Sequence, residues 1–283
     1  MRGTTIRIRE AGARRALTAA LLGLVATALS LAACASTGVN KGDFNIMSYE
    51  EEWQLGAQLE QDIARQLRLL NDATALNYLN SMGQRIVAQT ELAQAPWEFH
   101  IVADPQINAF NIPGGHVYVN TGLICAADNA AELAGVVAHE SAHGVARHGT
   151  EQYSRAYGAN ILASLVLGGN APLYQQILTS VVANGTFAKW GRDAEREADA
   201  LGVIYMYNAG YDPMGMVTMF QELLSRQQRS PSSVEQFFSS HPLTQERIET
   251  TRAQVQQLPP RANQITQDAG FPGLRQRVSA YCN

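Results

Sequence analysis

Three kinds of feature are scarce in this chain of 283 residues: cysteine, positive charge and long apolar segments. Its 21 lysines and arginines are outnumbered by 25 acidic residues, which gives a formal net charge of −4. Such a chain lacks the basic surface on which nucleic-acid binding depends, so we expect no nucleic-acid partner. Residues 16–33 form an apolar run that reaches only the lower limit for a transmembrane helix. We find no internal repeat, which argues against a repeat array.

The first 34 residues have the pattern of a bacterial lipoprotein signal. Residues 1–15 carry five arginines and one acidic residue, residues 16–33 are almost wholly small or apolar, and Cys34 follows. A basic segment, a short apolar segment and small residues before a cleavage site are typical of a secretory signal peptide. A cysteine directly after the small residues resembles the lipobox, in which that cysteine is lipidated and begins the mature chain. The alternative is an uncleaved signal anchor.

Lipid on Cys34 would anchor the protein to a membrane on the periplasmic side, because several acyl chains together give stable attachment. Ala35 follows the cysteine, and the absence of aspartate at this position favours the outer membrane. The exported compartment is oxidising. The two other cysteines, Cys125 and Cys282, therefore either form a disulfide or remain as one buried thiol and one loose thiol.

The remainder of the chain alternates helical and short extended patterns. Apolar residues at helical spacing predict helices at about 48–70, 73–90, 128–148, 192–209 and 244–257. Alternation with period two predicts strands at 97–102 and 116–119, on either side of a turn-rich loop at 108–115. These patterns predict one α+β domain that is mostly helical, with a small sheet before the helix at 128–148.

These patterns predict that the chain is divided into four parts. They are a signal peptide at 1–33, a lipidated tether at 34–47, a folded domain at 48–258 and an irregular tail at 259–283. Residues 157–187 are ambiguous, because their apolar stretch fits either a core helix or an apolar flap and is too short to span a bilayer.

The strongest chemical signal is the sequence His139-Glu140-Ser141-Ala142-His143. Residues four apart on a helix share a face, so both imidazoles can bind one ion. Neutral imidazoles suit Zn²⁺, and a catalytic zinc site has three protein ligands and one open position. Glu140 is then placed to act as the general base toward a water molecule. The alternative is a solvated helix that happens to carry two histidines.

A third zinc ligand is expected from the acidic segment 193–199. Glu195 and Asp199 are four residues apart on a predicted helix and share a face. Glu195 is the expected ligand, and Asp199 is the expected hydrogen-bond partner of the far nitrogen of a ligand histidine. Glu197 points elsewhere, and we interpret it as a solvated charge.

His241 precedes a proline after a predicted helix, which is an unusual place for a core histidine. It either makes a structural hydrogen bond or enters the open zinc position, where it would displace the catalytic water and inhibit. Arg247 is expected to pair with an active-site carboxylate or to help stabilise an oxyanion. The other histidines are interpreted as structural: His100, His116 and His148.

The predicted strand His116-Val117-Tyr118-Val119 has two interpretations. As an edge strand beside the zinc site it would pair with an extended peptide through backbone hydrogen bonds, largely regardless of the peptide's side chains. The alternative is an ordinary hairpin strand with no contact to substrate.

Further segments in a fixed order complete a resemblance to a known family. In addition to the motif at 139–143 they are Asn108-Ala109-Phe110, Pro113-Gly114-Gly115, Thr121-Gly122-Leu123, Arg147-His148, Glu195-Arg196-Glu197-Ala198-Asp199, Gly210-Tyr211-Asp212-Pro213 and His241-Pro242. Together they cover about residues 48–250. The set resembles the gluzincin peptidases that include the CAAX prenyl protease and the heat-shock protease HtpX, and in particular their exported members of the BepA/LoiP type.

The resemblance implies one Zn²⁺ per chain, bound by His139, His143 and Glu195, with Glu140 as general base and acid. It also implies endopeptidase action on unfolded, misfolded or misassembled envelope proteins, with precursors of β-barrel proteins among the candidates. Two other functions stay open. One is a chaperone-like binding lipoprotein whose zinc site is latent or structural, and the other is a zinc hydrolase of cell-wall peptides.

Overall fold

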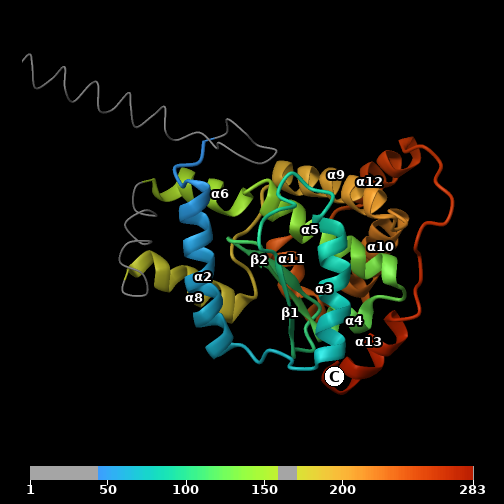
Figure 1. The fold of residues 1–283 in the computed structure, drawn as a ribbon, viewed down its shortest axis with the longest axis horizontal. Helices are drawn as coiled ribbons and strands as arrows, with labels where there is room; N and C mark the ends of the chain where they lie inside the picture. Colours follow the sequence, from blue (N-terminus) through green and yellow to red (C-terminus); the bar gives the residue numbers. More distant parts are fainter. Residues whose placement is uncertain (1–43, 159–170, 283) are drawn as a thin grey trace, which may run out of the picture.

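The computed structural model describes residues 44–158 and 171–282 (Figure 1). The predicted signal peptide, Cys34 and most of the tether lie outside the described residues, and so does most of the apolar stretch within 157–187. The helices and strands are α2 (Tyr49–Gln66), α3 (Ala73–Val87), β1 (Glu98–Val102), β2 (Ala109–Ile112), β3 (His116–Asn120), α4 (Thr121–Ala126), α5 (Ala130–Val145), α6 (His148–Tyr157), α8 (Pro172–Asn184), α9 (Arg192–Ala209), α10 (Met214–Arg229), η2 (Pro231–Ser233), α11 (Glu235–Ser240), α12 (Gln245–Gln257), α13 (Phe271–Val278) and η3 (Ser279–Tyr281). The prediction of a mostly helical α+β domain with a small sheet is confirmed.

A three-stranded sheet lies at the centre, with the strand order β1-β3-β2. β3 is parallel to β1 and antiparallel to β2. β2 falls in the segment that the sequence predicts as a loop. Its four residues adjoin the Pro113-Gly114-Gly115 turn, in which Gly114 and Gly115 have φ of 84° and 78°. The sequence therefore predicted a loop here, because turn residues adjoin β2 and the strand is too short to show a clear alternation of apolar and polar residues.

The central position of β3 overturns the edge-strand prediction for His116, Val117, Tyr118 and Val119. Both sides of β3 are hydrogen-bonded to neighbouring strands, so a substrate cannot pair with it. The segment 68–70 already bonds to the outer edge of β1, so a peptide could be added only at β2.

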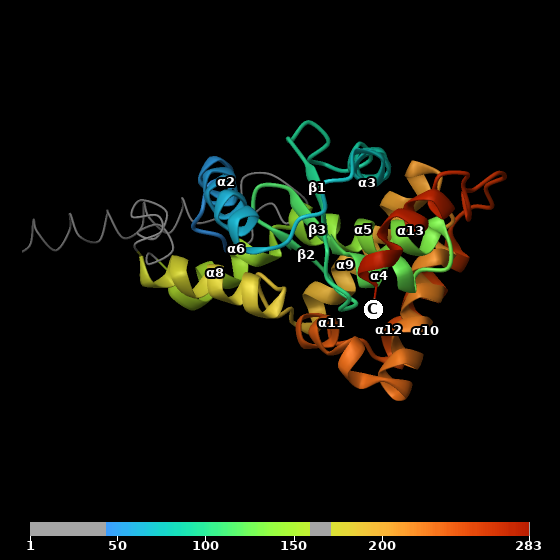
Figure 2. The ribbon, with the colours of Figure 1, turned by 90° about the horizontal axis from the view of Figure 1, so that it is seen from below.

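The two faces of the sheet pack against different helices (Figure 2). Phe99, Ile101 and Val117 belong to the larger apolar core, which α3, α5, α9 and α10 complete. Phe110 and Tyr118 point to the opposite face and pack against α2 and α8. None of the described helices is long and apolar enough to cross a bilayer.

α5 runs through the middle of the domain and carries the histidine motif. Asn129 caps its N-terminus by accepting the backbone N–H of Glu132, whose carboxylate in turn accepts the N–H of Asp128. Every residue of the helix except Gly144 is buried. The helix ends before the predicted position 148 because Arg147 adopts a left-handed conformation with φ of 58°. His148 then begins α6 in a new direction.

The segment after residue 258 is part of the domain instead of the irregular tail that the sequence predicts. α13 buries Phe271, Leu274 and Val278 in the larger core. The following turn brings Cys282 to Cys125, and the two form a disulfide across a sequence separation of 157. Of the two alternatives for these cysteines, the structure therefore contains the bridge.

A buried ion pair joins the start of the domain to the α5–α6 corner. The Nε of Arg147 donates to Glu52 on α2, and its Nη2 donates to the carbonyl of Met47 at 2.8 Å. The hydroxyl of Thr150 also donates to Glu52, at 3.1 Å. Burial raises the pKa of the Glu52 carboxyl, and the Arg147 charge opposes this shift. Residues 45–47 are therefore docked on the domain instead of belonging to a free tether.

Replacing Arg147 with alanine is expected to lower the free energy of unfolding by about 3–5 kcal/mol, because a buried carboxylate loses its cation. Urea denaturation followed by circular dichroism measures the change. Arg155→Ala is the matched control, since Arg155 is 63% exposed and exposed pairs contribute about 0–1 kcal/mol. An equally small effect of both substitutions would contradict the structural role of the Glu52–Arg147 pair.

Candidate metal centre

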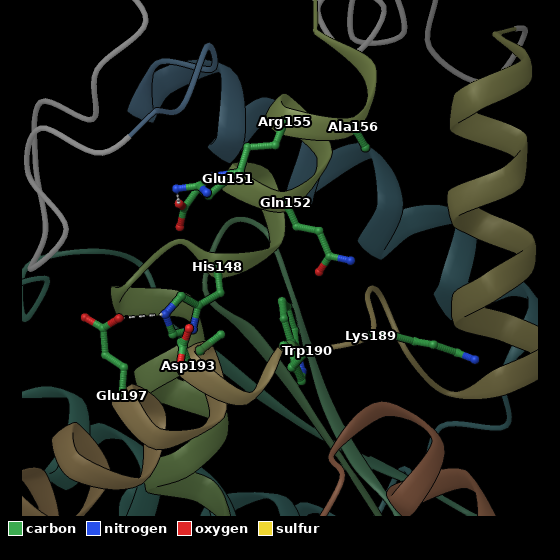
Figure 3. Close-up of a pocket in the computed structure, with 11 residues that line it drawn as sticks. His148, Glu151, Gln152, Arg155, Ala156, Lys189, Trp190, Asp193 and Glu197 are labelled. Atoms are coloured by element: carbon green, nitrogen blue, oxygen red, sulfur yellow. Dashed lines mark hydrogen bonds and ion pairs between the residues drawn. The ribbon is translucent and has the colours of Figure 1, made fainter.

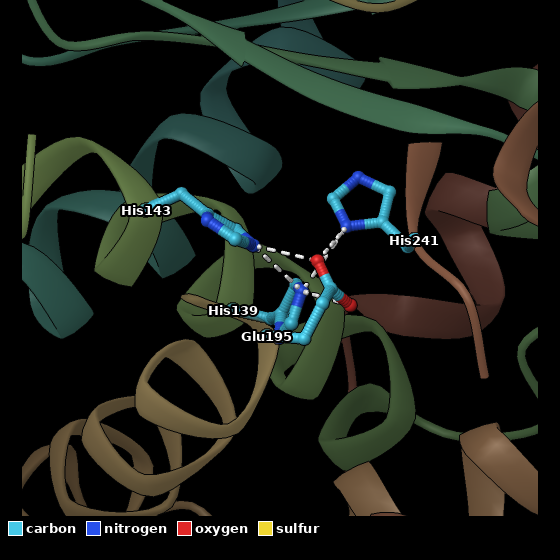
Figure 4. Close-up of side chains that lie close together, drawn as sticks. All are labelled: His139, His143, Glu195 and His241. Carbon is cyan, nitrogen blue, oxygen red and sulfur yellow. Dashed lines mark hydrogen bonds and ion pairs between the residues drawn. The ribbon is translucent and has the colours of Figure 1, made fainter. Parts of the chain in front are cut away.

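Two helices bring the three predicted ligands together (Figure 4). His139 and His143 project from one face of α5, and Glu195 projects from the first turn of α9. The Nε2 of His143 lies 3.1 Å from the Nε2 of His139 and 3.2 Å from Oε1 of Glu195. The His139 Nε2 lies 3.8 Å from Oε2 of Glu195. All three side chains are at most 1% exposed.

The charge state of these groups fits a zinc ion. Burial lowers the pKa of His143 well below its usual value, so this imidazole is neutral at neutral pH and offers a lone pair. Burial would raise the pKa of Glu195, but His241, His143 and His139 outweigh it and hold the pKa well below its usual value. An ionised carboxylate between two imidazoles is the donor set that catalytic zinc sites use.

Asp199 occupies the position predicted for it, one turn after Glu195. Its Oδ1 lies 3.0 Å from the Nδ1 of His139, and a carboxylate at this distance favours the tautomer with the proton on Nδ1, which leaves Nε2 free to bind metal. Arg247 donates to both oxygens of Asp199, at 2.8 and 2.7 Å, and also to Glu195. Two roles were predicted for Arg247, pairing with a carboxylate and stabilising an oxyanion. In the structure Arg247 pairs with carboxylates. Burial opposes ionisation of Asp199, but the hydrogen bonds from His139 and Arg247 prevail and lower its pKa.

His148 and Glu197 also support the centre, which the sequence interpretation missed. The Nδ1 of His148 lies 2.9 Å from the Nδ1 of His143, and its Nε2 lies 3.2 Å from Glu197. This series of contacts from Glu197 through His148 fixes the orientation of the His143 ring, as Asp199 fixes that of the His139 ring. No helical spacing signalled it, because the left-handed residue Arg147 turns His148 back toward α5.

A cavity of about 770 Å³ lies between α6 and the start of α9 (Figure 3). His148 and Glu197 line it, together with Trp190, whose ring stacks on His143 at a centroid distance of 4.3 Å. The cavity therefore reaches His148 and Trp190, which contact the predicted zinc ligand His143 from outside. The side chain of His143 itself is fully buried.

His241 completes a group of four donors with His139, His143 and Glu195. Its Nδ1 lies 3.0 Å from Oε1 of Glu195 and 3.3 Å from the Nε2 of His139. Its other nitrogen, Nε2, lies 3.4 Å from Oε1 of Glu140. The imidazole thus stands between the predicted ligands and the predicted general base.

Glu140 is fully buried, and among the described residues no side chain makes a hydrogen bond to its two carboxylate oxygens, although the Nε2 of His241 stands 3.4 Å from Oε1 and the backbone N–H of Asn111 faces the carboxylate. Burial raises the pKa of the carboxyl, and the neighbouring imidazoles of His241 and His139 oppose this shift. A carboxylate whose pKa is raised holds a proton more strongly than an ordinary glutamate does, which suits a general base.

Residues 74–255 match the profile of peptidase family M48. The chain belongs to this family. The beta-barrel assembly-enhancing protease of Escherichia coli (strain K12) is 28% identical over 261 residues, which is 89% of this chain and 53% of that protein. The mitochondrial metalloendopeptidase OMA1 of Schizosaccharomyces pombe is 32% identical over 176 residues, 60% of this chain and 50% of that protein. The chain spans about half the length of these relatives.

Membership in M48 agrees with the chemistry of the centre. The family consists of zinc metallopeptidases, and the predictions of a zinc cofactor and of a metallopeptidase are confirmed. The individual roles assigned to the site residues stay predictions, which the geometry supports for His139, His143, Glu195 and Asp199.

Asp199→Asn is expected to weaken zinc binding about 10–100-fold, because an amide can present its N–H to His139 and no longer stabilises the required tautomer. Competition with a chromophoric chelator measures the affinity of the purified chain. Asp193→Asn is the control, since Asp193 lies on the same helix and is fully exposed. Unchanged affinity in Asp199→Asn would show that Asp199 does not orient the ligand.

Proposed function

We propose that this protein is a zinc-dependent endopeptidase of the bacterial cell envelope that degrades unfolded, misfolded or misassembled proteins. The observation that carries the proposal is the buried group of His139, His143 and Glu195, with the carboxylate of Glu140 next to it and without a hydrogen-bonding side chain. The signal-like residues 1–33 and Cys34 support export and lipid anchoring, with the outer membrane as the favoured location. The E. coli relative named for β-barrel assembly supports envelope proteins as substrates.

His139, His143 and Glu195 would hold the zinc ion, which would supply a Lewis acid for a scissile carbonyl and lower the pKa of water. Glu140 accepts a proton from the attacking water on a carboxylate oxygen. It then passes this proton to the nitrogen of the leaving amine, so that the peptide C–N bond breaks after the new C–O bond has formed. Asp199 and Arg247 keep the ligands in place during these proton transfers.

The edge of β2 that faces away from β3 is paired with no other described strand, although it is buried, and it supports an extended polypeptide as the substrate. The Asn120 N–H donates to the carbonyl of Asn108, so the backbone groups of even-numbered residues in β2 face β3. Those of Ala109 and Asn111 face away from β3, and the backbone of Asn111 lies beside Glu140. A substrate paired with β2 would therefore pass next to the general base, and backbone pairing would accept many sequences.

The position of His241 supports a latent state of this peptidase. Its imidazole stands between Glu195 and Glu140, where a water and the scissile carbonyl would have to meet. Only 1% of His241 is exposed, so a substrate reaches the centre only after the segment around Pro242 moves. The position of His241 over the centre also favours a second candidate function. In that case the protein is a binding lipoprotein whose zinc site stays closed to substrate.

Glu140→Gln is expected to reduce cleavage of an unfolded protein such as casein at least about 100-fold, because glutamine cannot accept the proton. Zinc content should be unchanged, since Glu140 is not among the ligands. Glu235→Gln, an exposed acid on α11, is the control and should cleave at the wild-type rate. Equal cleavage by wild type and Glu140→Gln would remove Glu140 from the mechanism.

His241→Ala is expected to increase cleavage of the same substrate roughly tenfold or more, because it removes the group that occupies the centre and releases a minor open population. Initial rates at equal zinc loading measure the effect, and Ser239→Ala, an exposed neighbour, is the control. Lower activity in His241→Ala would indicate that the imidazole assists catalysis. Absence of cleavage in every variant, with zinc bound, would favour the binding lipoprotein.

A further inference from the structure

A second cluster of two histidines and one glutamate lies on the sheet, apart from the metal centre. Glu98 and His100 are alternate residues of β1, and the parallel register places His116 of β3 directly opposite Glu98. All three side chains point to the face that α2 and α8 cover. Oε2 of Glu98 lies 3.8 Å from the Nε2 of His100 and 3.9 Å from the Nδ1 of His116. The donor atoms of the three residues all lie within 4.8 Å of one another.

Two ring nitrogens of this cluster are buried and unsatisfied. His100 Nε2 and His116 Nδ1 have no hydrogen-bond partner among the described residues, although both face the Glu98 carboxylate. The distances of 3.8 and 3.9 Å are too long for a hydrogen bond and leave space between the three donor atoms. Buried polar atoms without a hydrogen-bond partner destabilise a fold. Two such ring nitrogens that face one carboxylate therefore indicate that a ligand binds between them.

The chemistry of the cluster matches that of a divalent transition metal. Burial lowers the pKa values of His100 and His116 to about 4 each, so both rings are neutral and able to coordinate at neutral pH. Ligands about 2.1 Å from zinc in tetrahedral geometry stand about 3.4 Å apart. The donor atoms here are separated by 3.8 Å, 3.9 Å and at most 4.8 Å, so the side chains would close in on the ion. Glu98 is 57% exposed, which leaves a path for the ion and room for water as a fourth ligand.

Groups around the cluster add negative charge instead of positive charge. Glu60 of α2 interacts electrostatically with Glu98, and burial together with this interaction raises the pKa of Glu60. Tyr118, next to His100 on the sheet, has a buried hydroxyl without a partner among the described residues. Among the described residues no lysine or arginine pairs with Glu98, and its two neighbours in the cluster are neutral imidazoles.

We propose that Glu98, His100 and His116 form a second binding site for a divalent transition-metal ion, with Zn²⁺ as the preferred occupant. The ion links β1 to β3 at the end of the sheet where the Pro113–Gly115 turn leads in from β2. It therefore stabilises the pairing of β1 with β3, without a part in hydrolysis.

Zinc titration of the purified chain, with bound metal measured by mass spectrometry after equilibrium dialysis, tests this site. The wild type is expected to bind two equivalents of Zn²⁺ per chain at micromolar concentration. The double variant His139→Asn/His143→Asn, which leaves only two of the four donors of the catalytic centre, should retain one equivalent, and the same variant combined with His100→Gln should bind none. The stoichiometry is independent of proteolysis, so a failed proposal of function leaves this result unaffected.

Glu98→Gln keeps the shape of an exposed side chain and avoids disturbance of the core. It is expected to raise the Kd of the second equivalent at least about tenfold, since one of three ligands is lost. The increase in Tm that the second equivalent causes in the wild type should also disappear. Glu50→Gln, an exposed acid on α2, is the control for unspecific binding. A single equivalent in the wild type, or two equivalents bound equally well by Glu98→Gln and His100→Gln, would overturn the proposal.

Discussion

The packing of α9 against α5 is the contact on which the metal centre depends. Gly202 makes a close approach possible, because a Cβ at this position would lie 3.3 Å from the backbone nitrogen of His139 and 2.7 Å from the side chain of Met216. Glu195 stands two turns earlier on the same helix, where it meets His143. The two helices carry all three predicted ligands, so the separation of their axes sets the distances within the donor group.

Buried charges hold the elements around this contact together. Arg247 of α12 donates to Asp199 and Glu195 of α9 and, through its Nη1, to the carbonyl of Pro242 at 2.9 Å. One guanidinium thus pairs with the carboxylate of the predicted ligand Glu195 and with that of Asp199 beside it, and it also anchors the segment that carries His241. Neither carboxylate would be ionised at this depth without such partners. The closed position of His241 is therefore coupled to the charge of the centre itself.

Local patterns predicted much of this arrangement. The spacing of His139 to His143 and of Glu195 to Asp199 correctly identified the side chains that meet, because residues four apart on a helix share a face whatever packs against it. The same reasoning failed for His148, since the left-handed backbone of Arg147 breaks the helix and returns the ring to His143. The strand β2 was not predicted from the sequence, because it lies between an asparagine and a Pro-Gly-Gly turn.

The sequence by itself determined the types of ligand, the helices that present them and the mostly helical α+β class, because these depend on residues within a few turns of one another. Only the tertiary structure decided which strand borders the centre, where His241 lies, that Cys125 meets Cys282 and that Glu98 faces two histidines. Each of these depends on how segments far apart in the chain pair or pack. Strand order and helix contacts are set by the burial of the whole core, which no local spacing encodes.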